Sequence, residues 1–194
     1  MMMAQIQQQK DRVDYTPKKF VMWLIVFSSF MMFAALTSGF IVYVGGKGKG
    51  LDIAIPPIFL YSTITIALSS VSMFLASRAA KRLQFSTQRL FLWVTIALGI
   101  AFFALQVNGW SQLVGMGVYF VNPNASQSFM YVFTGMHLLH IVAGLLLLLN
   151  SLVGSYRNIP QVKRVFWMEM SAIFWHFVDI IWIYLYVFLL LNQK

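Results

Sequence analysis

The sequence predicts an all-α integral membrane protein with five transmembrane helices. Three observations indicate this fold class: 60% of the 194 residues are hydrophobic, only 10% are charged, and the mean hydropathy is +0.76. Soluble domains carry about 25% charged residues, so this balance excludes that class. The chain also contains five apolar runs, each long enough to supply the roughly 20 residues that a helix needs to cross a bilayer.

The first helix is expected over residues 20–44, after a hydrophilic cytoplasmic tail of residues 1–19. The tail lacks the small-residue cleavage site of a signal peptide and is followed by a full-length span, so the first helix should be retained. A glycine-rich stretch then breaks the chain, and Pro56 and Pro57 favour a new helix start. The second helix is therefore expected over residues 58–77.

The remaining helices are expected over residues 90–113, 129–153 and 165–191. A basic connection precedes the third helix, and an uncharged connection with an Asn-Pro-Asn turn precedes the fourth. The sequence shows no internal repeat and no second domain. Residues 20–194 are therefore expected to form a single five-helix transmembrane domain.

Basic residues are unevenly distributed between the two sides of this topology. One side holds Lys10, Arg12, Lys18, Lys19, Arg78, Lys81, Arg82, Arg89, Arg157, Lys163 and Arg164. The other side holds Lys47, Lys49 and Lys194. The positive-inside rule then predicts a cytoplasmic amino terminus and an external carboxyl terminus. The net charge of +9 is explained by these short loops, so no nucleic acid partner is expected.

The last helix carries ionisable residues inside a segment apolar enough to span a bilayer. Glu169, Ala172, His176 and Asp179 lie on one helical face, because the steps between them are three, four and three residues. Ionisable groups at membrane depth are costly, so this face should turn toward protein rather than lipid.

The fourth helix carries His137 and His140 on one face, and Gly144 continues that stripe. Two interpretations are open: a metal site, or imidazoles that hydrogen-bond across helices. The chain has no cysteine and only one other histidine to complete a metal shell. We predict a buried polar contact that joins the fourth and fifth helices near mid-membrane through His140, His176 and Asp179, because an unpaired polar group in hydrocarbon is costly.

The remaining polar and aromatic residues are interpreted structurally, and only one basic cluster has a functional alternative, which is binding of a phospholipid headgroup. The second helix offers small hydroxyls that suit close helix packing or hydrogen bonds to the carbonyls of their own helix: Ser62, Thr63, Thr65, Ser69, Ser70 and Ser72. Arg157, Lys163 and Arg164 are either solvated topology determinants or contacts for a phospholipid headgroup. Four aromatic residues near predicted span ends are expected to be interfacial anchors: Trp23, Trp110, Tyr119 and Trp167.

Two sequence patterns resemble one membrane protein family. The pattern Trp-His-Phe-Val-Asp-x-x-Trp-x-x-x-Tyr of residues 175–186 is similar to the last helix of subunit III of the haem-copper cytochrome c oxidases. The Gly-x-His-x-x-His pattern of residues 135–140 resembles a stretch of the same subunit, in the expected order and spacing. Five spans resemble its short bacterial form, and the resemblance extends more weakly to Gln106 and Trp110.

The resemblance implies a non-catalytic subunit of a terminal oxidase in aerobic respiration, in the bacterial plasma (inner) membrane. Such a subunit packs against the catalytic haem-copper subunit I, in a complex with subunit II, and supports proton uptake and lipid binding. Haem and copper are expected in those partner subunits and no redox cofactor, metal or catalytic residue in this chain, while bound phospholipid is a candidate ligand. His137, His140, Glu169, His176 and Asp179 are then members of a structural polar network.

Two departures from the family pattern limit what the resemblance implies. The first shared helix usually has an acidic residue where this sequence has Ser29, and a glutamate expected after Gln106 falls at Gly109. A proton-collecting role of those carboxylates therefore does not transfer to this chain.

Two alternatives remain. A quinol oxidase or a nitric oxide reductase could use a similar third subunit, and nothing in these residues contacts an electron donor. A small proton or ion transporter would instead use the acid and histidine residues as a relay. Five unrepeated helices without a proline break in the last two argue against a transporter.

Overall fold

A computed structural model of the chain describes residues 16–47, 50–121, 123–157 and 161–193, without the side chains of Lys47 and Gln161. The helices are α2 (Thr16–Lys47), α3 (Ile58–Lys81), α4 (Phe85–Gly115), α5 (Ala125–Tyr156) and α6 (Gln161–Leu191). All five are long and apolar enough to cross a membrane, which confirms the predicted all-α, five-span fold class. Most of the predicted tail, with Lys10 and Arg12, lies outside the described residues, as do Lys49, Lys194 and the middle of the connection before α6.

The helices extend beyond their predicted bounds because local signals fix their ends. α2 is already helical at Thr16, the first described residue, and a proline such as Pro17 is tolerated in the first turn of a helix. α5 begins four residues earlier than predicted because the side chain of Asn124 accepts a hydrogen bond from Ser126 N at 3.1 Å and caps the helix. α4 ends where Gly117 adopts a positive φ of 80° and lets Val118 N donate to the Leu113 carbonyl at 3.0 Å.

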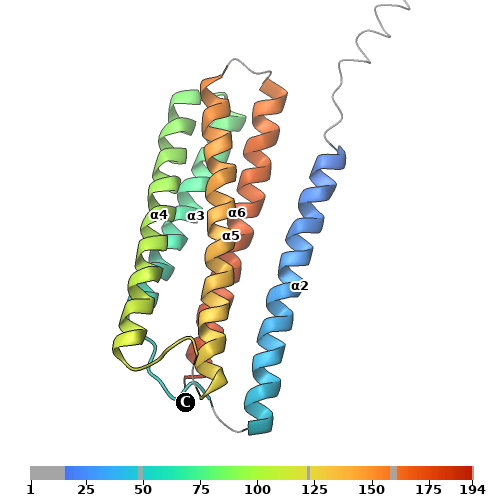
Figure 1. Cartoon of the computed structure of the whole chain (residues 1–194). Helices are drawn as coiled ribbons and strands as arrows, with labels where there is room; N and C mark the ends of the chain where they lie inside the picture. The colour runs from blue at the N-terminus through green and yellow to red at the C-terminus, as the bar shows by residue number, and fades with distance from the viewer. Residues whose placement is uncertain (1–15, 48–49, 122, 158–160, 194) are drawn as a thin grey trace, which may run out of the picture.

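Helices α3, α4, α5 and α6 form a bundle, and α2 stands at its side (Figure 1). Within the described residues, α2 packs against α5 and α6 but not against α3 or α4. Most large apolar side chains of α2 are consequently exposed, for example Phe20, Phe27 and Val42. The core of the molecule lies mainly between the four helices of the bundle, around the fully buried rings of Trp175 and Trp182 on α6, and it extends to the buried Phe33 and Phe40 of α2.

The connection between α2 and α3 is held against the carboxyl-terminal end of the chain. Leu51 N donates to the Asn192 carbonyl at 3.3 Å, and Gln127 Nε2 donates to the Leu51 carbonyl at 3.0 Å. The Leu51 side chain is fully buried. This end of the bundle is therefore closed by contacts from three separate parts of the chain.

The described basic side chains gather at the opposite end of the bundle, where α2, α4 and α6 begin and α3 and α5 end (Figure 1). They are Lys18, Lys19, Arg78, Lys81, Arg82, Arg89, Arg157, Lys163 and Arg164. The structure thus keeps on one end all the described members of the larger basic group. A cytoplasmic location of this end remains a prediction of the positive-inside rule.

Candidate functional site

Trp175 stands at the centre of the bundle and contacts all three of its neighbouring helices. Its indole N–H donates to Ser69 Oγ of α3 at 2.7 Å. A Cβ atom added at Gly99 of α4 would lie 2.8 Å from the indole ring, and one added at Gly144 of α5 would lie 2.9 Å from it. The two glycines therefore make the space that this ring fills.

Trp182, two turns along α6 from Trp175, also contacts several neighbouring helices with its ring. Its indole N–H donates to Thr63 Oγ1 of α3 at 3.0 Å, and its ring centroid lies 5.0 Å from that of Phe102 on α4. The His137 imidazole lies 4.9 Å from the same indole and 5.6 Å from Phe102. His137 is fully buried, and neither of its nitrogens has a hydrogen-bond partner among the described residues.

His176 and Asp179 form a polar pair on α6 against α3. His176 Nδ1 lies 2.7 Å from Ser70 Oγ, which makes a hydrogen bond at the middle of both helices. Asp179 is 2% exposed and lies beside the same hydroxyl without the geometry of a hydrogen bond. This pair faces α3 rather than α5, so it joins helices that are distant in the sequence.

His140 joins α5 to α2. Its Nδ1 lies 2.8 Å from the Met136 carbonyl oxygen, which can only accept, so Nδ1 carries the proton. In the neutral ring, Nε2 then accepts from the Ser29 hydroxyl, 3.2 Å away on α2. Ser29, which stands where the family pattern has a carboxylate, is thus the partner of this histidine.

The predicted direct contact of His140 with His176 and Asp179 is therefore wrong. The two histidines lie at the middle of adjacent helices but point to different neighbours, one to α2 and one to α3. α5 and α6 are joined instead by Trp175 at Gly144 and by Ser171, whose hydroxyl donates to the Leu147 carbonyl at 3.2 Å. The prediction placed the depth of the residues correctly and their direction around the helix axis incorrectly.

Glu169 lies apart from the mid-membrane residues, at the basic end of the bundle. Its carboxylate is 3.1 Å from Lys19 Nζ of α2 and 3.7 Å from Lys81 Nζ of α3. Glu169 of α6 thus connects to both α2 and α3 through these two ion pairs. Because the side chain is 29% exposed, each ion pair contributes modestly, about 1 kcal/mol or less.

The hydroxyls of α3 are engaged by neighbouring helices, as their packing interpretation predicts. Besides Ser69, Thr63 and Ser70, Ser62 Oγ accepts from Gln106 Nε2 at 2.9 Å and Ser72 Oγ accepts from Thr95 Oγ1 at 3.1 Å. The exception is Thr65, which donates to the carbonyl of its own helix. Small hydroxyls thus hold α3 to both α4 and α6.

The contacts of Thr95, Trp110 and Arg89 are among those that were not identified from the sequence as helix contacts. Thr95 carried no signal beyond its hydroxyl. Trp110, expected to be an interfacial anchor, donates its indole N–H to Thr134 Oγ1 of α5 at 3.0 Å. Arg89 donates to Ser155 Oγ at 3.1 Å and to the Ser155 carbonyl at 2.6 Å, which joins the start of α4 to the end of α5. The sequence did contain a signal for this contact, because Arg89 lies near the start of one predicted helix and Ser155 near the end of the next.

Gly109 explains structurally why the second family carboxylate is absent. A Cβ atom at this position would lie 3.1 Å from the Phe59 ring and 3.4 Å from Ile58 Cγ2, both on α3. α3 and α4 approach closely here, and no side chain fits without displacing Phe59.

The three histidines therefore occupy three separate environments: His137 among aromatic rings, His140 against α2, and His176 against α3. Within the described residues, no group of three His, Cys, Asp or Glu side chains is placed to hold a metal ion. His140, His176 and Glu169 instead contact different neighbouring helices, as expected of side chains that hold helices together.

Comparison with known proteins gives a consistent similarity along the chain. A family model described as "Cytochrome c oxidase subunit III" matches residues 11–192. Subunit 3 of the cytochrome bo(3) ubiquinol oxidase of Pseudomonas aeruginosa is 30% identical over 167 residues, which cover 84% of this chain and 79% of the relative. Cytochrome c oxidase subunit 3 of Thermostichus vulcanus is 30% identical over 188 residues, which cover 92% of this chain and 90% of the relative. Subunit 3 of the Buchnera aphidicola cytochrome bo(3) ubiquinol oxidase is 28% identical over 193 residues, covering 94% and 90%.

Proposed function

The chain belongs to the cytochrome c oxidase subunit III family and is a subunit III of a haem-copper oxidase, and we propose that it stabilises the catalytic subunit rather than carrying out redox chemistry itself. The observation that supports this role is the separation of its histidines and carboxylates among different helix contacts. Side chains arranged in this way fix helix positions and present a rigid surface to partners.

The partners proposed are the haem-copper subunit I and subunit II of the same complex, which would hold the haem and copper. The location proposed is the bacterial plasma membrane, with the basic end of the bundle in the cytoplasm. Relatives from a cytochrome c oxidase and a ubiquinol oxidase match at the same 30% identity, so the proposal covers both kinds of oxidase. The proton or ion transporter is not favoured, because the matched family model describes an oxidase subunit.

Purification of the tagged chain in mild detergent, followed by a haem absorption spectrum and mass spectrometry, tests this function. A large haem-bearing subunit should co-purify with the chain and give the complex its oxygen-reducing activity. A colourless homo-oligomer that moves protons across liposome membranes would contradict the proposal and restore the transporter alternative.

A phospholipid is proposed as the ligand of two adjoining hollows at the basic end. The first has a volume of about 220 Å³ and is lined by Arg157, Lys163, Arg164 and Trp167, among others. The second is an apolar hollow of about 320 Å³ between α2 and α6, and Trp167 lines it as well. A phosphate headgroup beside the basic side chains and an acyl chain along the apolar hollow would fit this arrangement.

Arg164 is already oriented within the first hollow. Its Nη2 donates to the Arg157 carbonyl at 2.9 Å, and its guanidinium lies 4.5 Å from the centre of the Phe85 ring. Its buried Nε has no hydrogen-bond partner among the described residues. The exposed side chains of Arg157 and Lys163 complete a positive rim.

Replacing both Arg157 and Lys163 by alanine should release anionic phospholipid from the purified oxidase. Each basic residue near a membrane surface contributes about 1 kcal/mol to the attraction of anionic lipid, so the double variant should bind it roughly thirtyfold more weakly. Mass spectrometry of extracted lipids measures the amount per complex. Arg82→Ala is the matched control, because Arg82 lies at the same end and outside the hollow. Equal lipid content in the double variant and the wild type would contradict the site.

A further inference from the structure

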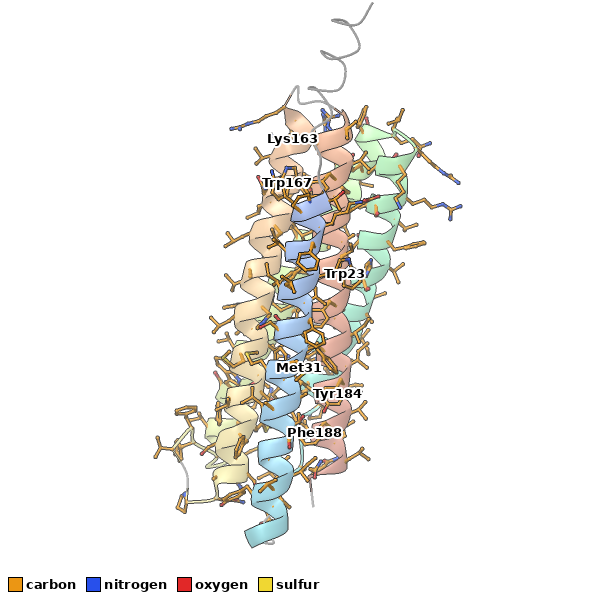
Figure 2. The ribbon with its side chains drawn as sticks, turned by 90° about the vertical axis from the view of Figure 1, so that its right-hand side faces the viewer. Trp23, Met31, Lys163, Trp167, Tyr184 and Phe188 are labelled. Atoms are coloured by element: carbon orange, nitrogen blue, oxygen red, sulfur yellow. The ribbon has the colours of Figure 1, made fainter. Side chains whose placement is uncertain are left out.

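One face of α6 is exposed between α2 and α3, which make no contact with each other among the described helices. Figure 2 shows α2 in front of the neighbouring helices, with Tyr184 and Phe188 of α6 beside it. Tyr184 OH lies 2.9 Å from Thr37 Oγ1 of α2, while His176 reaches Ser70 of α3 on the other side. At the basic end, Glu169 is bridged to Lys19 of α2 and to α3.

The side chains of this face follow a regular spacing along α6. The face, which we call the α6 stripe, consists of Glu169, Ile173, His176, Ile180, Ile183 and Val187. The steps between them alternate between four and three residues, which is the spacing at which one helix packs along another. Ile180 is 64% exposed, Ile183 43% and Val187 47%, so the half of the stripe away from the basic end is largely uncovered by the described residues.

His176 gives this apolar stripe a polar atom without a partner. The half-buried imidazole uses Nδ1 for Ser70, and Nε2 makes no hydrogen bond with the described residues. His140, at the same depth in α5, uses both of its nitrogens. Because His176 lies at the middle of α6, Nε2 would face hydrocarbon if lipid covered the stripe, and an acyl chain cannot donate or accept a hydrogen bond.

We propose that the α6 stripe is the docking surface for a transmembrane helix of another subunit of the oxidase, and that this helix presents a hydrogen-bonding side chain to His176 Nε2 at mid-membrane. The proposal rests on the proposed function, because it requires an assembled complex. It goes further because it assigns the α6 stripe to a partner helix and requires a hydrogen-bonding side chain on that helix at the level of His176.

A second copy of this chain fits the stripe less well than a different subunit. A copy with the same orientation in the membrane would bring its own Lys19, Lys81 and Arg78 to the level of the same residues here. Like charges placed opposite each other at an interface are unfavourable. A helix with acidic or neutral residues at that end would instead complement the excess positive charge around Glu169.

Site-directed photocrosslinking in the purified oxidase tests the docking surface. A benzophenone amino acid in place of Ile180 should form a covalent product with a transmembrane segment of another subunit that has a polar residue near its midpoint. The matched position is Ile100 on α4, which is 57% exposed and lies outside the stripe. A product at Ile180 with lipid only, with a second copy of the chain, or with the same residue that Ile100 reaches would overturn the proposal.

Variants of His176 test the hydrogen bond itself. His176→Leu should lower the retention of the crosslinked subunit during detergent washing by roughly tenfold, and His176→Gln should restore much of it. Ser70→Ala removes the contact at Nδ1 and the hydroxyl beside Asp179 but leaves Nε2 unchanged, so it should leave that subunit in place. Equal losses for Ser70→Ala and His176→Leu would assign His176 to the internal contact alone and overturn the proposal.

The same preparations separate this inference from the proposed function. If the haem-bearing subunit co-purifies while Ile180 reacts only with lipid, the docking surface is wrong and the function stands. If no haem-bearing subunit co-purifies with the wild-type chain, the proposed function itself fails.

Discussion

Replacing Trp175 by alanine should lower the free energy of unfolding by about 3–5 kcal/mol, the range observed for large aromatic residues removed from a packed core. The ring is fully buried and fills the space that Gly99 and Gly144 leave in the two neighbouring helices. Its loss would leave a cavity at the point where four helices meet. Unfolding of the detergent-solubilised chain, followed by circular dichroism, measures the change.

Two further variants separate the volume of this ring from its hydrogen bond. Trp175→Phe removes the N–H that donates to Ser69, and the lost hydrogen bond should contribute about 1 kcal/mol to the destabilisation. Trp93→Ala removes an indole that is 54% exposed on α4 and should change stability by less than about 0.5 kcal/mol. Similar losses for Trp93→Ala and Trp175→Ala would show that the glycine-lined space does not govern packing.

Introducing the family carboxylate by Gly109→Glu should destabilise the chain by about 3 kcal/mol or more. The first side-chain carbon would already lie 3.1 Å from the Phe59 ring, so this ring must shift, and overpacking of this kind costs about 1–3 kcal/mol. Burying a carboxyl group without a partner adds to that cost. Thermal unfolding in detergent and the yield of folded chain measure the effect.

The cause of this loss can be tested with a second substitution. Phe59→Ala should be destabilising alone but should partly relieve Gly109→Glu, because it removes the ring in contact with the new side chain. Gly115→Ala is the matched glycine control, since a Cβ atom there would meet nothing within 4 Å. Additive effects of the Phe59 and Gly109 changes, or full stability of Gly109→Glu, would contradict this account of the departure.

The number and order of the helices could be predicted from the sequence, because each transmembrane helix is recognised from the length of an apolar run alone. The helix ends could not, since they depend on local features such as the Asn124 cap and the positive φ of Gly117. The depth of His140 and His176 followed from counting residues along each helix. Their hydrogen-bond partners could not be predicted in this way. Each transmembrane helix is apolar on nearly all its faces, so its sequence gives little indication of which face contacts which neighbouring helix.

The candidate site shows the same limit in its particular contacts. Antiparallel adjacency of α5 and α6 was a correct basis for expecting contact between them, but the contact is made by Trp175 and Ser171 rather than by the histidines. Ser29 was recognised only as a missing carboxylate, although it is the partner of His140. These pairings depend on the rotation of each helix about its axis, which only the packed bundle fixes.

The central claim is that the acid and imidazole groups inside the membrane hold helices together and take no part in the reaction. The most direct measurement compares the initial turnover rate and the working life of the purified oxidase carrying His140→Leu or Glu169→Gln, which remove the contacts of His140 with Ser29 and of Glu169 with Lys19 and Lys81. Leu139→Ala is an exposed control on α5. We predict an unchanged initial rate and a shortened working life for both variants, because the helix contacts loosen before the catalytic subunit is affected. Loss of the first turnovers in a complex that still contains all its subunits would contradict the claim.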